Sequence, residues 1–184
     1  MEDLLRDRLP HAPQMGLFVT PNLPADRLEK ALSDYATDVT RDEVLALYDA
    51  TLSGTGGDGA VFTATRFVFQ NNDLQSTQTV RYPDLVGVEV QRRWLGLGGK
   101  VVALMVNRGR ATFELTMDFS GAPKAASYVG DFLDRAMVRD IDFAPASEPD
   151  TTDVAAVQEA LERLRAERKL TADDYERLLE ALET

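Results

Sequence analysis

The chain has 184 residues, a length that suits one compact domain with a small appendage. Its composition, with 44% apolar and 28% charged residues, is typical of a globular protein. The absence of cysteine excludes disulfide scaffolds, zinc knuckles, iron–sulfur sites and thiol nucleophiles. A single histidine, His11, excludes a histidine-rich metal site, so we expect neither a metal nor a cofactor.

The formal net charge is −11, which repels polyanions at long range, and we therefore expect no nucleic-acid partner. The acidic excess is uneven, because residues 145–184 hold eleven acids and five bases, a net −6. The first ten residues lack the apolar core of a signal peptide. The longest apolar run, residues 101–106, is too short to span a bilayer, and we expect a cytoplasmic protein.

The N-terminal region predicts an arm followed by two helices. Residues 1–22 are interrupted by three prolines and favour an N-terminal arm with one or two helical turns. From Pro24 onward, apolar residues recur at helical spacing and predict a first helix. The pattern Thr40-Arg-Asp-Glu43 is a capping box, which predicts that a second helix begins there. The apolar residues assigned to the two helices are Leu28, Ala31, Leu32 and Tyr35, then Val44, Leu47 and Tyr48.

A glycine-rich segment at residues 53–59 must end the second helix, and the apolar period then changes from 3.6 to 2. Six strands are predicted, and their short connections require consecutive strands to be antiparallel neighbours in an up-and-down meander. Their ranges are 59–64, 66–70, 76–82, 85–91, 100–107 and 110–117.

A third helix begins near Pro123, where proline is harmless in the first turn, and it presents a broad apolar face suited to cover one mouth of the sheet. That face holds Tyr128, Val129, Phe132, Leu133, Ala136 and Met137. Residues 143–153 are typical of a linker, and residues 154–184 predict a tail of two short amphipathic helices.

Two resemblances follow from these elements. The segments LALYDATLSGTG, GAVFTATRFVFQN and TVRYPDLVGVEV resemble the bacterial pleckstrin-homology-like family. The segment RLRAERKLTADDYERLLEAL (163–182) is similar to the short C-terminal (SHOCT) domain of bacterial proteins. Together they imply an α+β fold in which residues 23–142, including two entry helices, form an antiparallel up-and-down barrel capped by a C-terminal helix. Both families imply binding or assembly rather than catalysis.

The motifs that could carry chemistry have simpler structural interpretations. Gly54-Thr-Gly-Gly-Asp-Gly59 matches the dinucleotide pattern, but the predicted elements place it between a helix and a strand, not between a strand and a helix. We interpret it as a connecting loop that holds no phosphate. His11 lies between two prolines and is a poor general base. Glu89 and Glu114 fall on the outer side of their strands and are expected to be solvated. No catalytic residue is predicted, and an enzyme remains only an alternative.

Two sets of residues are candidate binding sites. In a meander, alternate turns lie at the same end, which gathers four arginines there as a candidate contact for anions or a membrane surface. The alternative is that these arginines are only solvated strand ends. A second candidate, for partner binding, is a loop in which Trp94 could instead fold back to fill the barrel. The residues are Arg66, Arg81, Arg108 and Arg110 for the first site, and Arg92, Arg93, Trp94, Leu95 and Leu97 for the second.

The tail is the candidate for self-association. A unit below about 40 residues rarely buries enough surface to fold alone, so its apolar stripes must cover something. We expect a homo-oligomer and further protein partners, with membrane binding as the alternative. The residues of the stripes are Val157, Leu161, Leu164, Tyr175, Leu178, Leu179 and Leu182.

Overall fold

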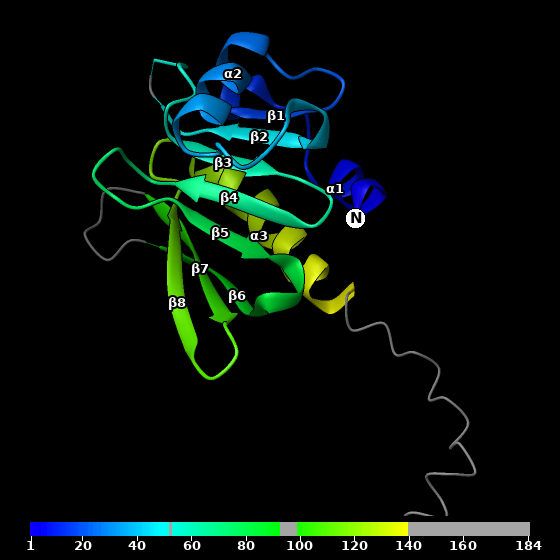
Figure 1. Ribbon diagram of the computed structural model, residues 1–184, viewed down its shortest axis with the longest axis vertical. Coiled ribbons are helices and arrows are strands. Elements are labelled where there is room, and N and C mark those ends of the chain that lie inside the picture. The colour runs from blue at the N-terminus through cyan, green and yellow to red at the C-terminus, as the bar shows by residue number, and fades with distance from the viewer. Residues whose placement is uncertain (52, 93–98, 140–184) are drawn as a thin grey trace, which may run out of the picture. The chain divides into compact units, whose positions relative to one another are not determined.

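The computed structural model describes residues 1–51, 53–92 and 99–139, with the side chain of Arg139 left out. These residues belong to one unit of the chain, Met1–Ile141. Figure 1 shows an α+β arrangement in which antiparallel strands pack with helices. Within the described residues, no helix is long and apolar enough to cross a membrane.

The first sheet contains five strands in the order β1-β2-β3-β4-β5, each antiparallel to the next. Three of the predicted strands are confirmed here, because β3, β4 and β5 fall within the expected ranges. The bounds are β1 Leu17–Val19, β2 Ala46–Asp49, β3 Gly59–Phe62, β4 Arg66–Gln70 and β5 Gln78–Arg81.

The first predicted helix is confirmed as α2 (Ala25–Asp34), whereas the prediction of a second helix from Thr40 is wrong. The capping box of Thr40 and Glu43 is present, but it closes only a short 3₁₀ turn, Arg41–Glu43. The chain then extends into β2, which lies between β1 and β3 and is buried along its whole length. A strand with both faces buried has no alternating pattern, so its apolar run can be mistaken for helix.

The second sheet contains the other three predicted strands in the order β6-β7-β8. They span Leu85–Arg92, Lys100–Asn107 and Thr112–Asp118. The prediction of one continuous meander closed into a barrel is not confirmed, because the described strands form two sheets and no closed barrel. The change of sheet occurs at the 3₁₀ turn Tyr82–Asp84, where Pro83 has no amide to donate and Tyr82 is buried.

The helix α3 (Pro123–Arg139) confirms the third predicted helix and packs on β6 and β7. Its Phe132 makes edge-to-face contacts with Phe62 and Tyr82, each with ring centroids 5.8 Å apart. The N-terminal residues, expected as an arm, form α1 (Glu2–Arg8), which contacts α3. Its Leu5 is fully buried in the same core.

The first sheet therefore has an apolar core on each face. On one face, Phe67 and Phe69 of β4 join the large core that α3 and the second sheet complete. On the other face, Val61 and Val68 pack with Leu28 of α2. The first sheet is thus covered by apolar packing on both faces.

Candidate functional site

The structure brings together three of the four arginines that the sequence grouped. Arg66 and Arg81 lie directly opposite each other in the register of β4 and β5. Arg108, which follows β7, donates a hydrogen bond of 2.9 Å to the carbonyl oxygen of Thr79 in β5. Arg110 lies in the exposed β7–β8 turn.

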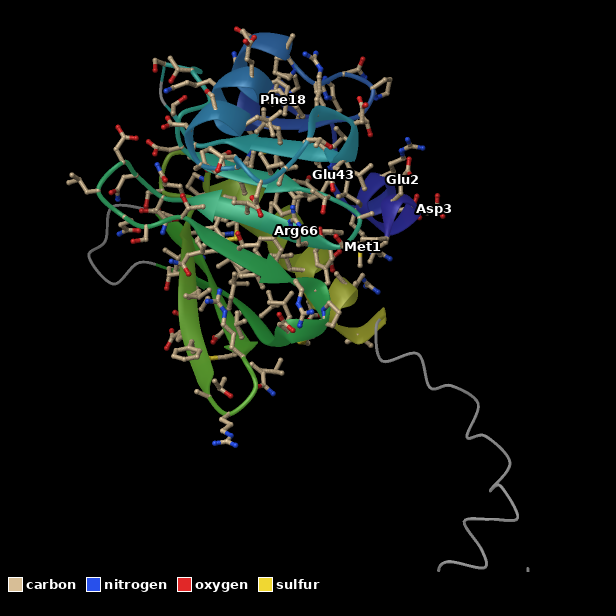
Figure 2. The ribbon with its side chains drawn as sticks, viewed as in Figure 1. Met1, Glu2, Asp3, Phe18, Glu43 and Arg66 are labelled. Atoms are coloured by element: carbon tan, nitrogen blue, oxygen red, sulfur yellow. The ribbon has the colours of Figure 1, made fainter. Side chains whose placement is uncertain are left out.

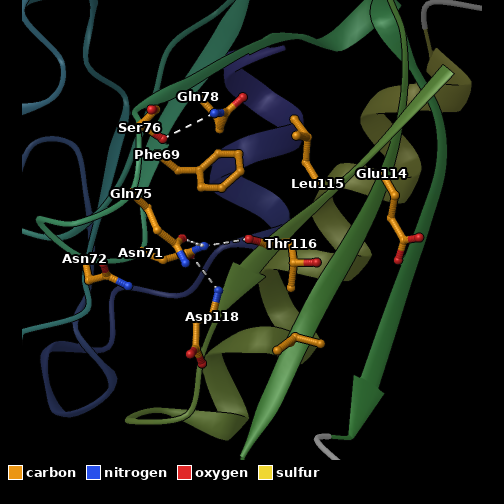
Figure 3. Close-up of a pocket in the computed structure, with 11 residues that line it drawn as sticks. Phe69, Asn71, Asn72, Gln75, Ser76, Gln78, Glu114, Leu115, Thr116 and Asp118 are labelled. Atoms are coloured by element: carbon orange, nitrogen blue, oxygen red, sulfur yellow. Dashed lines mark hydrogen bonds between the residues drawn. The ribbon is translucent and has the colours of Figure 1, made fainter. Parts of the chain in front are cut away.

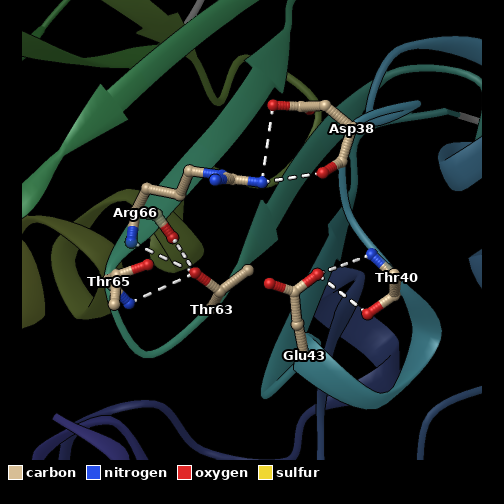
Figure 4. A network of polar contacts seen from close by, with 6 residues as sticks. All are labelled: Asp38, Thr40, Glu43, Thr63, Thr65 and Arg66. Carbon is tan, nitrogen blue, oxygen red and sulfur yellow. Dashed lines mark hydrogen bonds and ion pairs between the residues drawn. The ribbon is translucent and has the colours of Figure 1, made fainter.

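Local acids offset the charge of the two paired arginines. Arg66, labelled in Figure 2, places its guanidinium 2.7 Å from the carbonyl oxygen and 3.4 Å from the carboxylate of Asp38, as Figure 4 shows. Arg81 binds both carboxylate oxygens of Asp84, at 2.9 and 2.7 Å. The hydrogen bonds from Arg81 lower the pKa of Asp84, and the charge of Arg108 lowers it further. An anionic ligand here would compete with carboxylates that are already in place.

The other two groups of predicted binding residues are largely outside the described residues. Arg92 ends β6, is exposed, and lies opposite Lys100 in the ladder. Arg93, Trp94, Leu95 and Leu97 lie outside the described residues, as do all seven apolar tail residues that the sequence assigned to self-association.

The glycine-rich loop joins two strands, β2 and β3, and not a helix and a strand as expected. Its amides are used locally, because Thr55 and Gly56 both donate to the hydroxyl of Thr51. That hydroxyl in turn donates to Asp49, whose buried carboxylate also receives Arg27 at 3.2 Å. Arg27, Asp49 and Thr51 line a pocket of about 310 Å³, and their contacts organise the loop around an ion pair.

A larger pocket, of about 570 Å³, lies between the β4–β5 loop and β8 (Figure 3). Apolar side chains from three strands line its interior: Phe69 of β4, Leu115 of β8 and Val101 of β7. Neutral polar residues of the loop form its rim, together with Glu114, Thr116 and Asp118 of β8. The β4–β5 loop and β8 each also carry an exposed apolar residue, Leu74 and Phe113 respectively.

Asn71 closes one end of this pocket by binding the main chain of β8. Its side-chain nitrogen donates to the carbonyl oxygen of Thr116 at 2.7 Å, and its side-chain oxygen accepts from the amide of Asp118 at 2.8 Å (Figure 3). Gln75 holds the same amide group, since its side-chain oxygen lies 3.0 Å from the nitrogen of Asn71. One side chain thus occupies two outward main-chain groups of β8, which belong to residues two positions apart.

The same contacts show which main-chain groups of β8 face away from β7. In an antiparallel pair, alternate residues bond to the partner strand and the others point outward. The amide of Phe119, just after β8, donates to the carbonyl oxygen of Lys100, the first residue of β7. The amide of Asp118 instead donates outward, to the side-chain oxygen of Asn71. Thr112, Glu114 and Thr116 therefore also point outward, along the pocket. Of these groups, only the Thr116 carbonyl has a hydrogen-bond partner among the described residues.

The polar lining of the pocket is mostly uncharged. Its two titratable side chains, Glu114 and Asp118, belong to an edge strand, and the remaining polar groups are amides and hydroxyls. Among the described residues, no group of three His, Asp or Glu side chains could hold a metal ion. Sequence reasoning missed this pocket, since Asn71 carried only a turn signal and nothing in the sequence linked it to β8, 45 residues later.

No protein-family model, curated protein or solved structure matches this chain.

Proposed function

We propose that this chain is a non-catalytic binding module that recognises protein partners through the pocket between the β4–β5 loop and β8. The observation that carries the proposal is the combination of an apolar interior, at Phe69 and Leu115, with outward main-chain groups of β8 along the same opening. Apolar surface and a row of main-chain donors and acceptors together complement a polypeptide.

The alternative function, binding of anions or membranes through the arginines, has weaker support. Arg66 and Arg81 are bound to Asp38 and Asp84, and Arg108 donates to a carbonyl oxygen. Releasing them for a phosphate would leave those acids without their partners.

We also propose that the described fold is pleckstrin-homology-like. The support is the succession of four antiparallel strands (β2–β5), three further strands (β6–β8) and a helix, α3, that covers them. In this interpretation, α1 and β1 are additions at the N-terminus. The tail, residues 154–184, keeps the self-association that its apolar stripes predict, and it would cluster copies of the binding pocket.

The experiment for the pocket begins with selection of peptides from a random display library on the full chain. The positions of selected peptides are then mapped by amide chemical-shift changes in labelled protein. We expect the changes to concentrate at Phe69, Gln75 and Glu114. Peptides that instead shift only residues of α2, or a library that yields no binder, would contradict the proposal.

A further inference from the structure

Among the described residues, the edge of β8 from Thr112 to Glu114 lacks the protection that the edges of β5 and β6 have. Edges are commonly protected by bulges, prolines, lysines or a covering element. The β6 ladder has a register shift between Leu85 and Gly87, and its strand is contacted by α3. The β5 edge is contacted by Arg108. By contrast, β8 pairs with β7 without any register shift, and its sequence, TFELTMD, contains neither proline nor lysine.

We propose that β8 binds an extended segment of a partner protein as an added antiparallel strand, which pairs with Thr112 and Glu114 and ends where Asn71 binds Thr116. This inference rests on the proposed function and adds the mode of binding and the chemistry of the partner. The side chain of Asn71 already occupies the next pair of main-chain positions, at Thr116 and Asp118. It therefore fixes where the added strand must stop.

The two faces of β8 define the side chains of the partner. Phe113 and Leu115 lie opposite the buried residues Val106 and Leu104, so they belong to the inner, apolar face of the sheet. Glu114 lies opposite Met105 on the outer face, which also carries Glu89. An added strand would accordingly place apolar side chains inward, beside Phe113 and Leu115, and basic side chains outward, beside Glu114.

Charge also argues for a foreign partner over a second copy of this strand. In an antiparallel pair of two β8 edges, the Glu114 side chains of both copies would lie on the same face, opposite or next to each other. Like charges at such positions destabilise a sheet. Since the whole chain has a net charge of −11, a segment with lysine or arginine at alternate positions is the better complement.

The register gives a sharp test with a synthetic probe, a short capped peptide of alternating valine and lysine. A probe residue opposite Glu114 places its side chain on the same face of the sheet as Glu114. Its own amide and carbonyl groups point toward β8. The lysine amides of the probe must therefore bond to β8, while the valine amides face away. Methylating the lysine amides should weaken binding by at least tenfold, about the value of one hydrogen bond, whereas methylating the valine amides should change it little.

Variants of the protein test the same geometry from the other side. Glu114→Gln removes the side-chain charge and keeps the main-chain N–H of residue 114, whereas Glu114→Pro removes both the charge and that N–H. Because this amide points away from β7, proline at this edge position spares the β7 ladder. We expect Glu114→Pro to bind the valine–lysine probe at least tenfold more weakly than Glu114→Gln does. Amide spectra verify that both variants are folded, and the methylated probes decide the matter if Glu114→Pro does not fold.

Each outcome has a definite meaning. If the probe shifts pocket residues but both methylated probes bind equally well, the pocket binds peptides without strand addition, and only this inference falls. If the probe binds nowhere near the pocket, the proposed function falls as well. If the full chain dimerises and Glu114→Pro abolishes the dimer, the occupant is a second copy and the foreign partner is refuted.

Discussion

The side-chain amide of Asn71 binds two main-chain groups of β8, donating to the carbonyl oxygen of Thr116 at 2.7 Å and accepting from the amide of Asp118 at 2.8 Å. The β4–β5 loop is thereby tied to the edge of the second sheet. A single side chain in this way connects two sheets that share no ladder in this region.

The first prediction concerns this connection. Asn71→Ala removes both hydrogen bonds, and we expect it to lower the free energy of unfolding by about 1–2 kcal/mol. Asn71→Asp keeps the acceptor for Asp118 but loses the donor to Thr116, so it should also destabilise. Ser76→Ala, in the same loop, is the control and should stay within about 0.5 kcal/mol of the wild type. Urea denaturation measures all three, and equal stability of Asn71→Ala and the control would refute the bridging role.

The second prediction compares two glycines that share a left-handed backbone but differ in their surroundings. A Cβ at Gly56 (φ 77°) would lie 2.4 Å from the carbonyl oxygen of Arg27, whereas one at Gly109 (φ 75°) would meet nothing within 4 Å. Gly109→Ala should cost about 1–2 kcal/mol from backbone strain alone. Gly56→Ala should cost about 2–4 kcal/mol, because a steric clash is added. Thermal denaturation of both variants tests this order, and similar melting temperatures would contradict it.

The third prediction concerns the ion pair beneath the glycine-rich loop. Asp49 is 1% exposed and Arg27 31%, so Arg27→Met leaves a buried carboxylate with only its bonds from Thr51. We expect a loss of about 2–3 kcal/mol, less than for a fully buried pair because water reaches Arg27. The double variant Arg27→Met/Asp49→Asn should recover part of this loss. Strictly additive effects in the double-mutant cycle would show that the pair is not coupled.

The fourth prediction concerns acid stability at the capping box. The Thr40 amide, and then its hydroxyl, lower the pKa of Glu43 by hydrogen bonding. A carboxylate with a lowered folded pKa contributes stability above its unfolded pKa and loses that contribution as the pH falls through the folded pKa. Glu43→Gln should therefore melt below the wild type at neutral pH, and the two should converge in strong acid. Asp42→Asn serves as the control, and a difference that persists in strong acid would argue against the charge effect.

The fifth prediction concerns the tail. If the apolar stripes of residues 154–184 associate between copies, light scattering should find an oligomer for the full chain and a monomer for a version that ends at Ser147. A monomer in both cases would refute self-association and assign the tail to a foreign partner or to its own domain.

The success of sequence reasoning depended on whether an element had one buried face or two. In β8, buried Met117 and exposed Thr116 alternate as predicted, because only one side of the sheet is covered. In β2, Leu47 and Tyr48 face two different cores, and periodicity could not distinguish this strand from a helix. The capping box was recognised correctly, but a cap fixes only where a turn begins.

The candidate site was less predictable than the fold. The arginines could be grouped because the meander order brings their turns to one end, and Arg66 does lie opposite Arg81. The partner of Arg66 could not be predicted, because Asp38 lies in the connection after α2, 28 residues earlier in the chain. The strand edge at Glu114 became visible only through the position of Asn71, since hydrogen bonding of a side chain to a distant main chain leaves no local pattern.

The contact between the first and last described helices has a consequence for biosynthesis. Leu5 of α1 is buried in the core that α3 completes, and Arg8 lies 3.5 Å from Asp131 of α3. The apolar side chains of α1 leave the ribosome before their partners in α3, since Arg8 and Asp131 are 123 residues apart. The apolar side chains of α1 stay exposed on the nascent chain until α3 has left the ribosome. Folding of this unit is therefore completed late in its translation.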